Sequence, residues 1–276
     1  MTIGFNHLGR HGRLGNQMFQ YAGLRGIAAH RGFDFMIPQS DFKDEWNDHQ
    51  LFEAFKLKSL TNIGTCSGPY VQEAHFHYDP NLFDNMPDGH NVYGYLQSTK
   101  WFEHIEDSIR EDFEFKNDIY NPCKEMMDTI KNPIALHVRR GDYITNSDNH
   151  PPCTKEYYDT ALSNFDNNRT VVVFSDDPEW CTTEFPDDRF LISEGGDNLA
   201  DLCMMSMCSD FIIANSSFSW WGSWLSRNPD KRIIAPKKWF GTGYTAAHDT
   251  SDLYCDNWEV VCQRDHHHMI LLSVHL

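Results

Sequence analysis

The amino-acid sequence predicts an α/β fold built from two units with parallel sheets, and two observations lead to this prediction. Short apolar or β-branched runs, such as Pro133–Val138 and Thr170–Ser175, alternate along the chain with segments of helical periodicity. This pattern is typical of βαβ units and parallel sheets. The alternation starts at the N-terminus and starts again at Ile134, and 276 residues fit two domains at about 150 residues each. We therefore expect domains over residues 1–130 and 131–276, with a ligand-binding cleft between them.

The first unit opens with a strand and a glycine-rich loop that precede its longest helix. In chain order, we expect a strand over Thr2–Leu8, a loop over Gly9–Gly15, a helix over Asn16–Arg31, a strand over Phe33–Ile37, a helix over Trp46–Phe55, an irregular and aromatic stretch over residues 60–95, and an amphipathic helix over Trp101–Phe113. Phe19, Ala22 and Ile27 share one face of the first helix, as the 3.6-residue period requires. We expect the domain boundary within Phe115–Asn132.

The second unit alternates between strands and helices more regularly. In chain order, we expect a strand over Pro133–Val138, a helix over Thr154–Phe165, a strand over Thr170–Ser175, a helix over Asn198–Cys208, a strand over Asp210–Ala214, a helix over Phe218–Ser226 and a strand over Lys231–Ala235. Thr154 is the expected N-cap of its helix, because its hydroxyl can accept a hydrogen bond from a free backbone N–H. The capping box is incomplete, because Tyr157 stands where Glu or Gln is expected.

The charge is strongly acidic but unevenly distributed. Lys and Arg number 23 and Asp and Glu number 40, which gives a formal net charge of −17. This balance argues against a nucleic-acid-binding protein, since phosphate backbones select basic surfaces. Residues 1–33, however, contain four arginines and no acidic residue. A local anion site is therefore compatible with the overall charge.

Composition also restricts where the protein is expected. No apolar run reaches the roughly 18 residues that a transmembrane helix needs, and the N-terminus has no apolar segment typical of a secretory signal. The eight cysteines have irregular spacing and no CxxC pair, which favours reduced thiols. We expect a cytoplasmic protein, peripheral to a membrane at most, with no integral membrane segment.

Four polar clusters each follow an expected strand, at the edge of the sheet where ligands of open α/β folds bind. The first is Gly9–Gln17, which places Arg10, His11 and Arg13 between glycines. Glycines let backbone N–H groups approach an anion, and the helix that follows adds its positive dipole end. The spacing matches neither GxxxxGK[ST] nor GxGxxG. A solvated strand-to-helix turn is the alternative interpretation.

The second cluster is His137–Tyr143, which places Arg139 and Arg140 at a strand end. The planar guanidinium fork suits a diphosphate. His137 shares a strand face with Arg139 by the two-residue period, although a satisfied core histidine is the alternative. Asp142 could orient an arginine, take part in proton transfer, or be a turn residue bonded to local backbone.

The other two clusters combine carboxylates, an amide and hydroxyls. Phe174–Asp177 contains Asp176 at a strand end, where a carboxylate can bind a guanine edge or ribose hydroxyls, or serve the turn. Asn215–Trp221 contains Ser216 and Ser217 at an expected helix N-terminus. This position suits a diphosphate or a simple N-cap. The tryptophans of this cluster fit a core better than a ligand surface.

Taken together, these motifs resemble those of the α-1,2-fucosyltransferases of glycosyltransferase family 11. The matching segments occur in the family's order and are Gly12–Gln17, Gly94–Trp101, His137–Tyr143, Phe174–Asp177, Asn215–Gly222 and Ile234–Phe240. The HxRRGD pattern looks like one shared with α-1,6- and protein O-fucosyltransferases, which implies use of GDP-fucose. The pair GRLGNQ and NSSFSWWG implies the α-1,2 branch. The middle region and the histidine-rich tail match no family pattern.

The resemblance implies a GT-B-like architecture of two Rossmann-like domains facing a cleft, with the donor held mainly by the C-terminal domain. It implies inverting transfer of L-fucose from GDP-β-L-fucose to the 2-hydroxyl of a terminal galactose on an oligosaccharide or glycolipid. It also implies no metal and no other cofactor, and the chain has no D-x-D motif to hold Mg²⁺. The alternatives are fucose transfer to another position or to protein Ser or Thr, and GDP-sugar or glycan binding without catalysis.

The resemblance also implies roles for the site residues. We expect Arg139, Asn16 and Asp142 to be catalytic: Arg139 neutralises the β-phosphate as GDP leaves, and Asp142 is a candidate base, although some enzymes with a similar motif lack an obvious one. We expect Arg13, Gly15 and Gln17 to bind the substrate beside the diphosphate, and His137 and Asp176 to bind the guanosine. At the phosphate and ribose we expect Asn215, Ser216, Ser217 and Phe218. Arg140 is also expected to bind substrate, and it could also be structural.

Two regions have no assigned chemistry. The aromatic residues 40–95 are expected to recognise the acceptor. His266–His268 is a single cluster without further ligands, so a polar tail is a better interpretation than a metal site. The adjoining Met269–Val274 could pack as a last element or lie on the surface of a membrane-bound acceptor.

Overall fold

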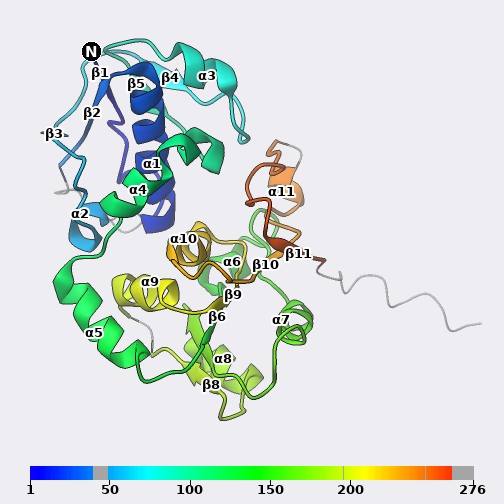
Figure 1. The fold of residues 1–276 in the computed structure, drawn as a ribbon. Helices are drawn as coiled ribbons and strands as arrows, with labels where there is room; N and C mark the ends of the chain where they lie inside the picture. The colour runs from blue at the N-terminus through cyan, green and yellow to red at the C-terminus, as the bar shows by residue number, and fades with distance from the viewer. Residues whose placement is uncertain (40–48, 195, 246, 263–276) are drawn as a thin grey trace, which may run out of the picture.

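The computed structural model describes residues 1–39, 49–194, 196–245 and 247–262. Two α/β units lie one above the other, each with its own parallel sheet (Figure 1). The expected GT-B-like arrangement of two Rossmann-like domains is thereby confirmed. The start of the helix expected at Trp46 and the tail with His266–His268 lie outside the described residues.

The first unit contains one parallel sheet, whose strands within the described residues run in the order β3-β2-β1-β5-β4. These strands are β1 (Thr2–Gly4), β2 (Asp34–Ile37), β3 (Asn62–Ile63), β4 (Tyr70–Gln72) and β5 (Asn91–Tyr93). The chain extends the sheet from β1 to β3 and then returns to the other side of β1. The direction of winding therefore reverses between β1 and β5.

The second unit repeats this plan with a parallel sheet in the order β11-β10-β9-β6-β7-β8 over the part of the chain that the structure describes. Its strands are β6 (Ile134–Val138), β7 (Val171–Ser175), β8 (Phe190–Ile192), β9 (Asp210–Ile212), β10 (Ile233–Pro236) and β11 (Glu259–Val261). Every residue of β6 and β7 is buried, as expected for central strands covered on both faces. The winding reverses between β6 and β9.

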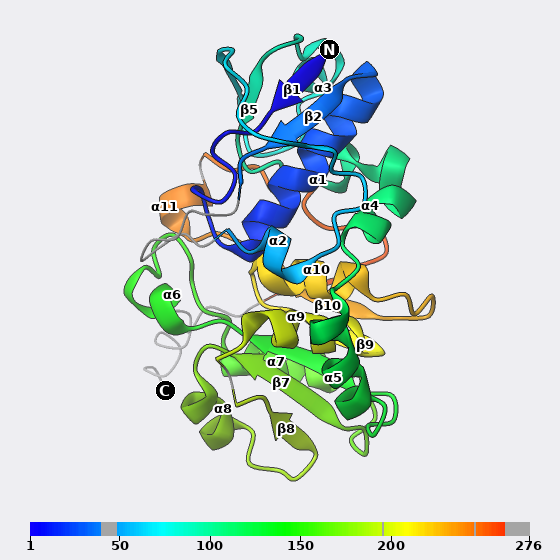
Figure 2. The ribbon, with the colours of Figure 1, turned by 90° about the vertical axis from the view of Figure 1, so that its left-hand side faces the viewer.

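Helices cover both sheets (Figures 1 and 2). In the first half of the chain they are α1 (Leu14–Arg31), α2 (Leu51–Ala54), α3 (Pro80–Asn85), the 3₁₀ turns η1 (Thr99–Trp101) and η2 (Glu103–Ile105), α4 (Glu106–Asp112) and α5 (Asn117–Met127). In the second half they are α6 (Gly141–Thr145), α7 (Lys155–Leu162), α8 (Pro178–Glu184), α9 (Asn198–Ser206), α10 (Ser217–Leu225) and α11 (Thr242–Thr245). The hydroxyl of Thr154 accepts a hydrogen bond from Tyr157 N–H at 3.2 Å, which confirms the predicted cap of α7.

The two units share an apolar interface in which α1 packs against α10. The ring of Phe19 lies 4.5 Å from Trp220 and 4.9 Å from Trp221, measured between ring centroids. Trp221 also contacts Phe102 and Phe113 of the first unit. Both tryptophans are fully buried, so their predicted core role is confirmed. This packing fixes the N-termini of α1 and α10 relative to one another.

Two sequence predictions of the first unit differ from the structure. The stretch 60–95 was expected to be irregular but contains β3, β4, α3 and β5, because strands of two or three residues are too short for a visible period. The helix expected over Trp101–Phe113 is divided into η1, η2 and α4. Here the carbonyl of Trp101 lies directly against Gly26 of α1, and Trp101 and Phe102 are buried, so packing against α1 replaces a regular helix.

The segment expected to hold the domain boundary forms α5, which packs against α9 of the second unit. Pro122 lies inside this helix, and a proline in a polar stretch is a typical helix breaker. The chain therefore crosses between the units along a helix that already contacts the second one.

Candidate active site

The predicted polar clusters meet where both sheets reverse their winding. The clusters at Gly9–Gln17, His137–Tyr143 and Asn215–Trp221 follow β1, β6 and β9, which border the reversal points. The cluster at Phe174–Asp177 includes the end of β7, next to β6. Ligands of open α/β sheets bind beyond the carboxyl ends of strands at such points. The topology thus brings segments from both halves of the chain to one location.

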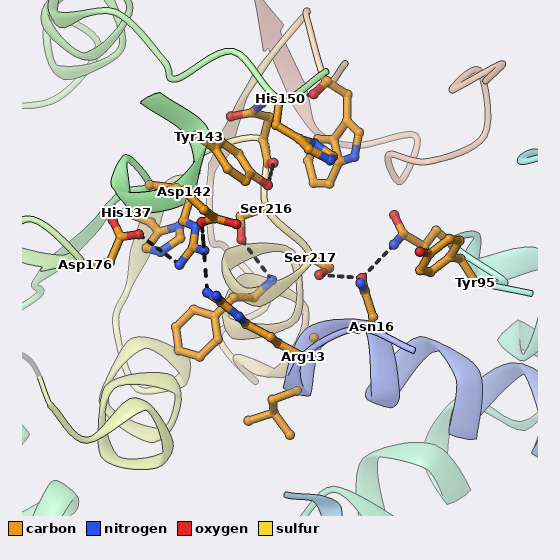
Figure 3. A pocket seen from close by; sticks show the side chains of 18 of the residues that line it. Arg13, Asn16, Tyr95, His137, Asp142, Tyr143, His150, Asp176, Ser216 and Ser217 are labelled. Carbon is orange, nitrogen blue, oxygen red and sulfur yellow. Dashed lines mark hydrogen bonds and ion pairs between the residues drawn. The ribbon is translucent and has the colours of Figure 1, made fainter. Parts of the chain in front are cut away.

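A cleft of about 910 Å³ lies at this location, between the two units. It is bordered by eleven of the thirteen predicted site residues: Arg13, Gly15, Asn16, His137, Arg139, Asp142, Asp176, Asn215, Ser216, Ser217 and Phe218. Gln17 and Arg140 are not among its lining residues. Figure 3 places Asp176 and His137 at one end and Tyr95 at the other, with Asn16 and Ser217 between them.

The N-termini of α1 and α10 touch at the floor of the cleft. A Cβ atom added to Gly15 would lie 2.6 Å from the backbone nitrogen of Phe218, so only glycine allows this approach. Beside it, Ser217 Oγ donates to Asn16 Oδ1 at 2.9 Å, and Gln97 Nε2 donates to the same oxygen at 2.8 Å (Figure 3). Two positive helix ends therefore converge on one point, an arrangement that favours an anion.

Two arginines from different units face this point and share one carboxylate. Arg139 pairs with Asp142 and, through Nη1, with Asp176 Oδ2 at 2.9 Å. Arg13 Nη1 lies 4.0 Å from Asp142 Oδ1 (Figure 3). Asp142 thereby links the loop after β1 to the loop after β6. The pairing places both guanidinium groups beside the helix ends.

The two adjacent arginines of the HxRRGD motif point to different surroundings. Arg140 Nε pairs with Asp177 Oδ2 at 2.9 Å, and its guanidinium carbon lies 4.3 Å from the centre of the Trp180 ring. Its backbone N–H donates to Asp176 Oδ1 at 2.8 Å. These contacts fix the strand end from which Arg139 projects, so the side chain of Arg140 supports the loop rather than bordering the cleft.

His137 borders the cleft as a buried, neutral imidazole. Burial, aided by the nearby charge of Arg139, lowers the pKa of His137 to about 3. Its ring lies 5.5 Å from that of Phe218, and its Nδ1 has no hydrogen-bond partner among the described residues. A neutral histidine with a free ring nitrogen can exchange a hydrogen bond with a polar ligand but cannot supply positive charge at ordinary pH.

Two other predicted residues hold the site together through hydrogen bonds. Ser216 Oγ accepts from Phe218 N–H at 3.3 Å, as the N-cap of α10. Asn215 Nδ2 donates to the carbonyls of Pro151 and Trp239 at 3.0 and 2.9 Å. Asn215 therefore ties the α10 N-terminus to two loops that border the cleft.

Gln17 stabilises the glycine-rich loop from behind. Its side chain is fully buried; Nε2 donates to the carbonyl of Gly12 at 3.1 Å, and Oε1 accepts from Gln50 N–H at 3.1 Å. Gly12 has a φ of 95°, a conformation that glycine adopts without strain. The loop that presents Arg13 is thus fixed by a glutamine that does not reach the cleft.

The rest of the cleft is bordered by the aromatic residues Phe76, Tyr95, His150, Trp239, Phe240, Tyr244 and His248. Sequence reasoning assigned none of them an individual role, although Phe76 and Tyr95 lie within the stretch 40–95 that was expected to recognise the acceptor. Tyr95, Trp239 and Phe240 stand within motifs quoted above, so their side chains could have been considered from those segments. The others lie within or after short elements that carry no pattern of their own.

The described residues include no group of three or more His, Cys, Asp or Glu side chains arranged to hold a metal ion. Metal independence stays a prediction. Within the same residues, no helix is long and apolar enough to cross a membrane.

Two Rossmann-like domains that face an arginine-lined cleft at both reversal points define a GT-B-like architecture. The sequence profile described as Glycosyl transferase family 11 matches residues 70–261. An Escherichia coli protein named alpha-1,2-colitosyltransferase is 32% identical over 268 residues, which cover 83% of this chain and 90% of that protein. The chain therefore belongs to glycosyl transferase family 11.

Two further comparisons agree with this placement. The mouse protein named galactoside 2-alpha-L-fucosyltransferase Sec1 is 24% identical, with 78% of this chain and 62% of that protein covered. The crystal structure of the fucosyltransferase NodZ from Bradyrhizobium superposes with a TM-score of 0.53 at 13% identity, over 80% of this chain and 92% of that one. The structural likeness confirms the fold.

Proposed function

We propose that the protein transfers L-fucose from GDP-β-L-fucose to the 2-hydroxyl of a terminal galactose, with inversion to an α-1,2 linkage. The observation that supports this most is the convergence of two helix N-termini with Arg13 and Arg139 in one cleft. A diphosphate leaving group needs stabilisation where negative charge develops, and fixed N–H dipoles and guanidinium groups supply it. The names of the galactoside fucosyltransferase relatives support the sugar and the linkage.

The proposed donor site extends from the helix ends to His137. Arg139 and the N–H group of Ser217 bind the β-phosphate, and Arg13 with Gly15 covers it from the other domain. His137 and Asp176 bind guanosine, and Phe218 offers a ring beside His137. Asn16 orients this site by accepting hydrogen bonds from both Ser217 and Gln97.

In the proposed reaction, the galactose 2-oxygen attacks the anomeric carbon of fucose from the face opposite GDP. The bond between that carbon and the β-phosphate oxygen breaks, and its electron pair leaves with GDP. Arg139 and the two helix ends stabilise the charge that develops on the phosphate. The proton of the 2-hydroxyl passes to a base or to water. Asp142 is paired with both arginines, which favours a positioning role for this carboxylate.

Replacement of Arg139 tests the proposal, and the neighbouring Arg140 is the matched control. Removal of one preorganised electrostatic group typically lowers kcat about 100- to 1,000-fold, and we expect this loss for Arg139→Ala. Arg140→Ala should keep kcat within about tenfold, since its guanidinium contacts Asp177 and Trp180 rather than the cleft. Equal losses in the two variants, or normal turnover by Arg139→Ala, would contradict the leaving-group role.

A second candidate is transfer of colitose, the 3-deoxy analogue of fucose, because one relative at 32% identity carries that name. A comparison of GDP-fucose and GDP-colitose as donors, with one β-galactoside as the acceptor, distinguishes the two functions. Linkage analysis of the product tests the α-1,2 position against other positions. GDP-fucose binding without any transfer would favour a non-catalytic module.

We also place the enzyme in the cytoplasm, where a glycolipid acceptor would bring it to a membrane surface. The eight cysteines are all free thiols, which suits a reducing compartment. Fractionation of expressing cells, with the enzyme followed by activity, tests this location.

A further inference from the structure

The lining of the cleft divides by chemistry into two ends. The charged end contains Arg13, Arg139, Asp142, Asp176 and Asp201. The aromatic end contains Phe76, Tyr95, His150, Phe240, Tyr244 and His248. Figure 3 shows Asp142 and Asp176 on one side of the contact between Asn16 and Ser217 and Tyr95 on the other. The proposed donor site uses the charged end and leaves the aromatic end without a role.

Tyr95 forms a fixed platform on the wall that belongs to the first unit. The His11 ring stacks on it with a centroid distance of 4.5 Å and an interplanar angle of 27°. Tyr95 borders the cleft, while His11 is not part of the lining. The backbone N–H of Tyr95 donates to Glu73 Oε2 at 2.8 Å, which holds the platform in place.

The opposite wall is a set of rings from the second unit. Phe240 lies 5.8 Å from Tyr244 and 5.0 Å from His248. The loop that carries them is held by the bond from Asn215 to Trp239 and by Gly241 N–H, which donates to the carbonyl of Asn149 at 2.8 Å.

The two walls meet through Phe76, whose ring lies 5.1 Å from Phe240. Aromatic side chains from both units therefore meet within the cleft. Tyr95, Phe240 and Tyr244 are only partly buried, unlike the fully buried tryptophans of the interdomain core.

The chemistry of this end fits a pyranose better than a nucleoside. A guanine base presents N–H groups on one edge, which carboxylates accept, and the carboxylates that border the described cleft belong to the charged end. A β-galactose ring presents a face of C–H groups, which packs on aromatic rings, and hydroxyls that need a few polar partners. Gln97 and His150 border the same end and supply amide and imidazole groups.

We propose that the aromatic end binds the terminal β-galactose of the acceptor by stacking on Tyr95, with Phe240 and Tyr244 as the facing wall. The inference rests on the proposed function for the identity of the sugar. The position of the aromatic end suits the transfer reaction, because Tyr143 connects the aromatic end to the charged end. The Tyr143 ring stacks with His150 at 5.0 Å, and the Arg139 guanidinium carbon lies 5.3 Å from its centre. The aromatic end thus adjoins Arg139, which the proposed reaction places at the leaving group.

Tyr95→Ala and Tyr95→Phe test the stacking, and Tyr120→Ala is the control, because Tyr120 is an exposed tyrosine of α5. Loss of one aromatic contact should raise the KM for a β-galactoside such as lactose about tenfold in Tyr95→Ala. The KM for GDP-fucose should stay within about twofold in all variants, which also shows that they fold. Tyr95→Phe should retain the wild-type KM for the acceptor, since the ring remains.

Calorimetry of lactose binding to the GDP-saturated protein provides a readout that does not depend on turnover. We expect binding by the wild type and by Tyr95→Phe, and none measurable for Tyr95→Ala. If Tyr95→Ala raised the KM for GDP-fucose and left the KM for lactose unchanged, the aromatic end would bind the nucleoside, and the inference would be overturned. Unchanged lactose binding by Tyr95→Ala would overturn it as well. Lactose binding that requires Tyr95, in a protein that transfers no fucose, would refute the proposed function and leave the acceptor site standing.

Discussion

Gly15→Ala tests how closely the two helix N-termini must approach for the enzyme to work. The added methyl carbon would lie 2.6 Å from the backbone nitrogen of Phe218 and from Ser217 Oγ. This is about 0.8 Å short of the ordinary van der Waals distance. The obstacle on the far side is backbone, so the strain cannot be relieved by turning a flexible side chain. The two domains must separate by a similar amount.

A separation of this size should affect catalysis more than stability. Overpacking typically costs about 1–3 kcal/mol, and the alanine regains about 1 kcal/mol of helix propensity. The net loss in the free energy of unfolding is therefore about 0–2 kcal/mol. The hydrogen bond from Ser217 to Asn16, now 2.9 Å, would lengthen beyond useful range. Misplacement by about 1 Å can cost about 100-fold in rate, and we expect that loss in kcat/KM for GDP-fucose.

Gly222→Ala is the matched control for this prediction. Gly222 lies on α10, and its added methyl would meet the side chain of Met205 within the same domain. A methionine can move aside at small cost, so kcat/KM should stay within about threefold of the wild type. Initial rates with GDP-fucose and urea unfolding would be measured for both variants. Near-normal kinetics in Gly15→Ala, with stability equal to the control, would refute the idea that this contact sets the geometry of the cleft.

Two further predictions concern the dependence of stability on pH and the dependence of activity on metal ions. Burial raises the pKa of Glu73 to about 7, above its value of 4.5 in the unfolded chain, so its contribution to stability is present below pH 4.5 and is lost as the pH rises through 7. The size of this loss is about 3 kcal/mol. The free energy of unfolding of Glu73→Gln should therefore fall less steeply than that of the wild type between pH 5 and 8. Parallel curves for the variant and the wild type would contradict this prediction. Fucose transfer should keep its rate within about twofold in excess EDTA, because arginines and helix ends replace a cation in the proposed mechanism. A loss that Mg²⁺ restores would contradict this.

The sequence could predict the parts of the site that follow long, regular elements. His137 and Arg139 lie at the end of a fully buried strand, and Ser216 lies at the start of a helix. The local sequence pattern predicts both the strand end and the helix start. The sequence could not decide which of Arg139 and Arg140 faces the cleft, because that depends on Asp177 and Trp180, which come from a later loop and helix. Gln17 was placed at the substrate by its motif, yet its partners are backbone groups behind the loop.

The aromatic end illustrates a second limit of sequence reasoning. Tyr95 follows a strand of three residues, and Tyr244 belongs to a helix of four. Elements this short carry no periodicity that separates a packed ring from one that faces a cleft. The surface exists only because β5 returns beside β1 and the loop after β10 reaches the same edge from the other domain. Its recognition required the topology of both sheets.

An acidic protein can bind an anionic donor, because the effect of each charge depends on its distance from the ligand. Charges spread over the surface are screened beyond about 8 Å at physiological salt, so a net charge of −17 acts weakly within an enclosed cleft. Arg13 and Arg139 act at contact distance, in a region of lower dielectric where the same charge has a larger effect. Asp142 joins the two arginines, so Arg13 of the acid-free N-terminus and Arg139 of the HxRRGD motif form a single unit. Donor affinity should therefore depend on these few groups and on the meeting of two helix ends rather than on the overall charge.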